Sequence, residues 1–134
     1  MKILIPLECR TKKNSPRIVR QGGRPILLPS KAYIEFEKHC KPFLKPLKID
    51  KAVNLKCLFY MKTRRKVDLP NLLNSICDVL VKYQVITDDN KEIVAAFDGS
   101  RVLYDKNNPR IEIEITEMGV NSILNKGPKE EDKE

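Results

Sequence analysis

The fold is best predicted outward from residues 66–80, which read Lys66-Val67-Asp68-Leu69-Pro70-Asn71-Leu72-Leu73-Asn74-Ser75-Ile76-Cys77-Asp78-Val79-Leu80. Apolar residues recur there at helical spacing, which predicts an amphipathic helix from about residue 69 to 83. Its buried stripe contains Leu72, Ile76, Val79, Leu80 and Tyr83. Asp68 stands where the helix begins, as an N-cap, and Pro70 is tolerated in a first turn.

Cations are clustered in this chain of 134 residues, whose formal net charge is +8. Two runs contain no acidic residue: Arg10, Lys12, Lys13, Arg17, Arg20 and Arg24, and then Lys62, Arg64, Arg65 and Lys66. Clustered cations favour nucleic acid, because phosphate contacts release counterions. A solubilising surface or a different anionic partner is the alternative. The second run directly precedes Asp68, and carboxylates within a basic surface indicate a divalent metal that acts on a polyanion.

The remaining sequence predicts one domain of the α+β class. Residues 52–61 and 111–115 alternate as half-buried strands, and residues 2–8, 26–28 and 92–104 predict further strands. Another helix follows Ser30, with Tyr33, Phe36, Cys40 and Phe43 on one face. We expect a single mixed, largely antiparallel sheet with two main helices packed on it.

The connections and the end of the chain are predicted from composition. Residues 10–25 predict a basic loop or an open hairpin, and residues 105–109 predict a hairpin turn. Residues 1–118 form the predicted domain. Residues 119–134 are polar, so we expect a flexible tail there.

The cysteines and the start of the chain bear on the cell compartment. Cys9, Cys40, Cys57 and Cys77 lack the close spacing of a zinc site, so buried free thiols are expected rather than ligands or disulfides. No stretch approaches the roughly 18 apolar residues of a membrane span. The first residues are too short for a signal peptide and run into charge, so a cytoplasmic location is expected.

Asp68 and Asp89 are candidate ligands for a hard divalent ion such as Mg²⁺, which takes one or two carboxylates together with water and phosphate. Such an ion would polarise a phosphate and activate water for in-line attack. A helix over residues 69–83 is roughly 22 Å long, so the two acids cannot meet along one straight helix without help from the sheet or a second subunit. The alternatives are that Asp68 only caps the helix and that Asp88-Asp89-Asn90 is only an acidic turn.

Two other features bear on the same site. Asn71, Asn74 and Asp78 lie on one face of the predicted helix, at spacings of three and four residues. Asp98-Gly99-Ser100-Arg101 interrupts a predicted strand, where Gly99 marks a bulge or a close backbone approach. Asp98 is a candidate metal ligand and Arg101 a candidate phosphate contact, whereas a plain β-bulge with a solvated Asp98 is the alternative.

From about residue 60 to 119, the chain resembles the RusA-type Holliday-junction resolvases, a family of crossover junction endodeoxyribonucleases. The shared pattern is a basic run, Asp-x-x-Asn-Leu, a helix ending Cys-Asp-Val-Leu, Asp-Asp about ten residues later, and strands closing in Ile-Glu-Ile-Glu-Ile-Thr-Glu-Met-Gly. The resemblance implies a small homodimeric endonuclease, often borne by prophages, that depends on Mg²⁺ (or Mn²⁺) and cuts four-way DNA junctions in recombination and repair. It implies that Asp68 and Asp89 are catalytic and hold the metal together with Asp88.

The chain departs from the family motif, Asp-x-Asp-Asn-Leu-x-Lys, at two positions. Pro70 stands where the second Asp is expected, and Asn74 stands where a catalytic Lys is expected. The loss of a carboxylate weakens metal binding, and the loss of the Lys removes a cation that stabilises charge on phosphate. Either the protein binds junctions without cutting them, or Asp98 and Arg101 have rebuilt the site.

Three functions are therefore expected, in descending order. The first is a Mg²⁺-dependent endonuclease that nicks branched DNA as a symmetric homodimer, with two sites related by a two-fold axis. Its candidate DNA contacts are Lys12, Lys13, Arg17, Arg64, Arg65 and Arg101. The second is a non-cleaving junction-binding or nucleic-acid-binding protein on the same fold. The third is a basic prophage interaction protein with no role on DNA.

Overall fold

The centre of the fold is strand β4, Val53–Met61, whose side chains alternate between buried and half-buried along its whole length. The computed structural model describes residues 1–12 and 17–119, and in it β4 is hydrogen-bonded on both edges. On one edge, β7, Arg110–Glu117, pairs antiparallel with β4, and β1, Lys2–Ile5, pairs antiparallel with β7. On the other edge, two short strands run parallel to β4: β5, Val94–Ala96, and β6, Arg101–Tyr104. The predicted mixed, largely antiparallel sheet is confirmed.

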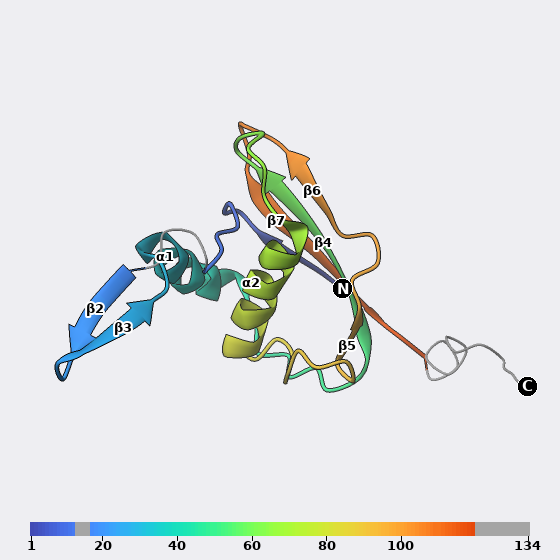
Figure 1. Ribbon diagram of the computed structural model, residues 1–134. Coiled ribbons are helices and arrows are strands. Elements are labelled where there is room, and N and C mark those ends of the chain that lie inside the picture. The colour runs from blue at the N-terminus through green and yellow to red at the C-terminus, as the bar shows by residue number, and fades with distance from the viewer. Residues whose placement is uncertain (13–16, 120–134) are drawn as a thin grey trace, which may run out of the picture.

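Helix α2, Leu69–Lys82, crosses one face of this sheet, and α1, Lys31–Cys40, lies beside it (Figure 1). Both helices bury apolar residues that were predicted to face the core: Leu72, Ile76, Val79 and Leu80 of α2, and Tyr33, Phe36 and Cys40 of α1. Two helices packed with a mixed sheet confirm the α+β class. The hydroxyl of Tyr83, just past α2, donates to the carbonyl of Glu37 at 3.0 Å and joins the two helices. None of the described helices is long and apolar enough to cross a membrane.

Three predicted boundaries differ from the structure, each for a local reason. Helix α1 ends at Cys40 and continues as a 3₁₀ turn, η1, Lys41–Phe43, which leaves Phe43 42% exposed instead of buried. Strand β1 ends at Ile5, because the backbone turns at Pro6 and the Leu7 N–H donates to the Ile5 carbonyl. Strand β5 starts only at Val94, because its N–H still bonds back to the carbonyl of Asn90.

The basic region before α1 forms a closed hairpin that stands apart from the main sheet. Its strands are β2, Arg17–Gln21, and β3, Arg24–Leu28. Gly22 and Gly23 make the turn with positive φ angles of +59° and +78°, a combination that side chains with a Cβ rarely adopt. Figure 1 shows the hairpin extending beyond α1. Of the remaining predictions, Lys13, the turn Asn14-Ser15-Pro16 and the tail beyond Gly119 lie outside the described residues.

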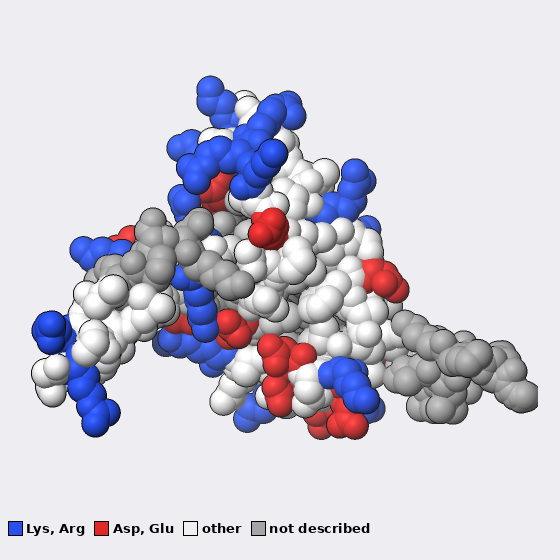
Figure 2. Space-filling model, viewed as in Figure 1, with Lys and Arg blue, Asp and Glu red and all other residues white. Residues whose placement is uncertain are grey.

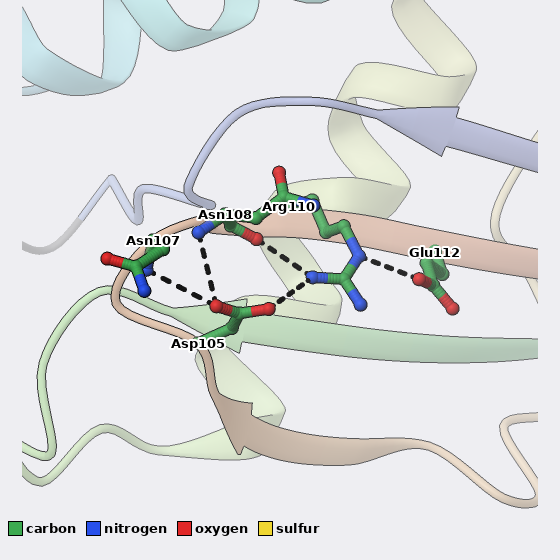
Figure 3. Close-up of polar contacts among 5 residues, drawn as sticks. All are labelled: Asp105, Asn107, Asn108, Arg110 and Glu112. Carbon is green, nitrogen blue, oxygen red and sulfur yellow. Dashed lines mark hydrogen bonds and ion pairs between the residues drawn. The ribbon is translucent and has the colours of Figure 1, made fainter.

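The turn at residues 105–109 does not close a hairpin, because β6 and β7 pair with opposite edges of β4. The turn instead passes over the end of β4, where the Asp105 N–H donates to the Met61 carbonyl at 2.9 Å. Figure 3 shows that the Asp105 carboxylate accepts hydrogen bonds from two backbone N–H groups of the turn and from Arg110, which also binds Glu112. The bond from Arg110 holds the pKa of Asp105 below its usual value. Composition predicted the turn but not which strands it joins.

The four cysteines are buried free thiols, as predicted. Burial raises the pKa of Cys40, Cys57 and Cys77 to about 12 and shifts that of Cys9 in the same direction. These thiols are therefore neutral core side chains near pH 7. They supply neither disulfides nor a reactive nucleophile.

Candidate active site on helix α2

Asp68 is the N-cap residue of α2, yet its side chain does not cap the helix. The backbone N–H groups of Asn71 and Leu72, in the first turn, bond to the backbone carbonyl of Asp68 at 3.1 and 3.2 Å. The Asp68 carboxylate is exposed and receives only a 3.4 Å contact from the side-chain amide of Asn71. The predicted position is confirmed, but the carboxylate remains available to a ligand.

The chain after α2 folds back, and this brings Asp89 alongside the helix. Gln84, with a positive φ of 60°, reverses the chain, and a parallel bridge between Ile49 and Ile86 holds the returning segment. Asp89 then shares a cavity with Asn71, Asn74 and Asp78 of α2. It therefore lies beside the middle of the helix, which removes much of the separation that a straight helix would impose.

Asp88 has a different role from its neighbour. One of its carboxylate oxygens accepts the Asp89 N–H at 2.7 Å, and the other accepts the side-chain amide of Asn90 at 3.1 Å. Asp88 thus stabilises the turn that carries Asp89. Within residues 1–12 and 17–119, no hydrogen bond or ion pair engages the Asp89 carboxylate itself.

Residues 9–12, hereafter the strap, run across α2 and form one wall of the site. Cys9 is buried, and the Ser75 hydroxyl donates a hydrogen bond to the carbonyl of Arg10. At the end of the strap, the Lys12 ammonium forms an ion pair with Asp78 at 3.0 Å and lies 5.6 Å from the centre of the Tyr33 ring. Lys12, predicted to contact DNA, is thus placed on the site together with Asp78.

Two cavities flank the strap. The larger, of about 460 Å³, lies between the strap and residues 61–68, and Asp68 and Asn71 form part of its wall. The smaller, of about 300 Å³, contains Asp78 and Asp89. Thr11 and Asn71 line both cavities, so the two cavities adjoin along α2. Asp68 and Asp89, predicted to act together, lie on these two neighbouring cavities.

The negative charges of Asp78 and Asp89 contribute to the pKa shifts of neighbouring side chains. Burial is the main cause of the raised pKa of Cys77, and the negative charges of Asp89 and Asp78 add to it. Asp78 also contributes to the raised pKa of the Tyr33 hydroxyl, after burial and the charge of Glu37. Asp78 and Asp89 therefore act on the same part of the helix.

The donor set suits a hard cation. Asp68 and Asp89 offer carboxylate oxygens that no described cation neutralises, and one or two carboxylates satisfy Mg²⁺ in most proteins. No three His, Cys, Asp or Glu side chains of the described residues come together as a metal cage. Pro70 is exposed at the start of α2, and it supplies no oxygen ligand from its side chain. Each of these carboxylates thus suits an ion that takes most of its ligands from water and phosphate.

Residues 62–66, hereafter the basic segment, follow the end of β4 and border the larger cavity. Lys62, Arg65 and Lys66 line this cavity. The Arg64 guanidinium lies 4.0 Å from the centre of the Tyr104 ring, which is 40% exposed. Figure 2 shows Lys and Arg side chains gathered where this segment and the turn after β6 lie. Of the two predicted cations, Arg65 therefore lines the site, whereas Arg64 lies against Tyr104 and lines neither cavity.

Asp98 and Arg101 lie on the far edge of β4. The side chain of Asn54 in β4 bonds to both the N–H and the carbonyl of Asp98, at 2.8 and 3.1 Å. Gly99 has a φ of +88° and lies against the Lys56 side chain. Neither Asp98 nor Arg101 lines either cavity. Arg17 begins β2, but its side chain lies outside what the structure describes.

Sequence patterns did not reveal the strap. Thr11 and Ser75 join the predicted residues in the smaller cavity, and Glu8 joins Asp68 in the larger one. Ser75 could have indicated a contact at this position, because a polar residue on the apolar flank of a helix needs a hydrogen-bond partner when it is buried. Its partner, Arg10, is remote in sequence, so no local pattern identifies the pair.

One comparison with known proteins found a matching family. A family model described as Endodeoxyribonuclease RusA matches residues 6–116. The matched span includes the strap, both helices and all the candidate acids. A search of curated protein sequences gave no match.

Proposed function

Because the chain belongs to the RusA family of endodeoxyribonucleases, we propose that it is a Mg²⁺-dependent nuclease that nicks branched DNA, four-way junctions above all, during recombination or repair. The observation that carries this proposal is the pair of uncommitted carboxylates, Asp68 and Asp89, on adjoining cavities of one helix. The basic segment borders those cavities, so a phosphate backbone can approach despite the acids.

In the proposed reaction, the oxygen of a water molecule bonds to phosphorus while the bond from phosphorus to one sugar oxygen breaks. The water loses a proton, and the departing sugar oxygen gains one. A divalent ion held by Asp68 and Asp89 would polarise the phosphate and activate the water, with Mn²⁺ as a possible substitute for Mg²⁺. Asn71 restrains Asp68, and Asp88 supports Asp89 through the turn.

Cations around the site orient the DNA in this proposal. Lys12 and Arg65 line the two cavities and are the nearest candidates. Arg64, Arg101, Lys13 and Arg17 extend the proposed contact surface. We leave Asp98 outside the ligand set, because its backbone is bound to Asn54 and it lines neither cavity. Paired nicks across a junction require two sites, so the active form is proposed to be a two-fold symmetric homodimer.

A non-cleaving junction-binding protein is the second candidate. One observation favours it: the described residues contain no cage of three acidic or other metal-binding side chains. Pro70 and Asn74 would then mark a site that has lost its chemistry while the fold and the basic segment still bind DNA.

The test is a cleavage assay on an end-labelled four-way junction with Mg²⁺ or Mn²⁺, alongside EDTA and an Asp89→Asn variant. We expect symmetric nicks that disappear in EDTA and fall at least about 100-fold in Asp89→Asn, because the variant removes charge that holds the ion. A matched control, Asp50→Asn, changes an exposed acid outside both cavities and leaves cleavage unchanged. A retarded but uncut junction would favour the binding protein, and no binding even at low salt would favour an interaction role away from DNA.

A further inference from the structure

The smaller cavity presents an electrostatic problem for a nuclease. Its described wall carries two acids, Asp78 and Asp89, and a single cation, Lys12. The other described residues that line it are neutral. A phosphodiester that enters this space meets two like charges, each of which opposes its approach. The only opposing charge on the described wall is the Lys12 ammonium.

Lys12 is held in place by several contacts. Its ammonium is 3.0 Å from an Asp78 oxygen and lies within cation–π range of Tyr33, at 5.6 Å from the ring centre. The strap that carries it is fixed through buried Cys9 and through the bond from Ser75 to Arg10. Lys12 and Asp78 remain 50% and 40% exposed, so a ligand in the cavity can still reach them.

Stability is a weak reason for this arrangement, because ion pairs with this exposure contribute little to folding. A lysine that is both restrained and accessible is instead suited to a ligand. Such a group needs little reordering when an anion arrives, and a positive charge fixed in advance stabilises charge that develops in a transition state.

We propose that Lys12 is a catalytic residue of the cleavage site, contacting the scissile phosphate from the strap, and that Asp78 is a positioning residue that holds it there. This inference rests on the proposed nuclease function. It differs from the expectation drawn from the sequence, in which Arg101 replaces the family lysine that Asn74 lacks. Asn74 lines the same cavity as Lys12, so the strap delivers a cation to the place where α2 itself has none.

In this scheme Lys12 leaves its bond with Asp78 for a non-bridging phosphate oxygen. As water adds to phosphorus and the sugar oxygen departs, negative charge on the phosphate oxygens is balanced by the ammonium. Lys12 keeps its proton throughout. Asp78 limits the positions that the ammonium occupies before the DNA binds.

The test is single-turnover cleavage of a prebound junction, which separates chemistry from binding. Lys12→Gln should lower the cleavage rate about 100-fold, as removal of one preorganised donor does elsewhere, and change junction affinity less than about threefold. Lys82→Gln is the matched control, because Lys82 also ion-pairs on α2, with Glu37 at 2.7 Å, but outside the cavity. A loss of affinity with an unchanged rate at saturation would reduce Lys12 to a DNA contact and overturn the proposal.

Variants that keep or move the positive charge of Lys12 test the same role. Lys12→Arg should retain most of the rate, and Lys12→Gln combined with Asn74→Lys should recover at least about tenfold, because position 74 lines the same cavity. Failure of both variants to exceed Lys12→Gln would contradict a role for positive charge at this place. If the unmodified protein cuts no junction, the nuclease function fails instead, so the two failures are distinguishable.

Asp78 is tested separately through metal binding. Asp78→Asn should lower the single-turnover rate about tenfold while the affinity for Mn²⁺, measured by calorimetry without DNA, stays within twofold. Asp89→Asn is the comparison and should weaken Mn²⁺ binding strongly. A comparable loss of Mn²⁺ affinity in Asp78→Asn would make Asp78 a ligand and overturn its positioning role.

Discussion

At the scale of single residues, the two helices begin in contrasting ways. Ser30 caps α1 with its hydroxyl, which accepts the Tyr33 N–H at 3.1 Å, and it is buried. Asp68 occupies the same position on α2 without such a bond. A residue that stands at a cap position and does not cap is free to serve another purpose, which we propose is metal binding.

This contrast predicts different costs for the two substitutions. Ser30→Ala should lower the free energy of unfolding by about 1 kcal/mol, the usual effect of a lost N-cap, whereas Asp68→Ala should lower it by less than about 0.5 kcal/mol and still abolish cleavage. Urea denaturation with equal slopes gives both values. If Asp68→Ala destabilised the protein as much as Ser30→Ala, the Asp68 side chain would have a capping role after all.

At the scale of elements, β4 depends on a side chain for part of its ladder. Between β5 and β6, the Ser100 hydroxyl accepts the Cys57 N–H at 2.9 Å and donates to the Leu55 carbonyl at 3.2 Å. The interruption at residues 98–100 is therefore a gap between two strands, where the serine side chain replaces the missing backbone partner. This account explains Gly99 and Ser100 without any metal.

Loss of that hydroxyl should weaken the sheet. Ser100→Ala leaves two backbone groups of β4 without their partner and should cost about 1–3 kcal/mol of unfolding free energy. Thr63→Ala serves as the control, because Thr63 is exposed and accepts only a 3.4 Å contact, so its loss should stay within about 0.5 kcal/mol. Equal effects in thermal or urea unfolding would mean that Ser100 is not part of the ladder.

The elements also show where sequence patterns succeed and fail. The alternation of β4 and the stripe of α2 are local periodicities that burial imposes, so both were predictable. The return of Asp89 beside α2 depends on Gln84 and on the bridge from Ile49 to Ile86, and the pairing of Lys12 with Asp78 depends on a strap that crosses the helix. These contacts join distant segments, so they determine the site without leaving a local pattern. The family motif singles out Asp68 and Asp89 as candidates, but it gives no position for the cation that we propose at Lys12.

At the scale of the whole molecule, cations are unevenly distributed, with the basic segment at one end of β4. DNA binding should therefore weaken steeply with salt, and each phosphate contact that is lost should reduce the logarithmic salt slope by about 1. In the Asp89→Asn background, which leaves DNA uncut, Arg65→Gln should reduce the slope. Lys51→Gln, which precedes the opposite end of β4, should leave it unchanged. Equal slopes for the two variants would place the DNA elsewhere.

The strand order has a consequence for how the protein is made. β7 lies between β1 and β4, and the backbone of Ile115 accepts a bond from the amino group of Met1. During synthesis on the ribosome, β1 and β4 emerge well before the strand that separates them. The sheet therefore cannot close until residues 110–117 have left the exit tunnel. Until then one edge of β4 lacks its hydrogen-bonding partner, so a stalled or shortened chain would expose an unpaired strand edge and be a client for chaperones.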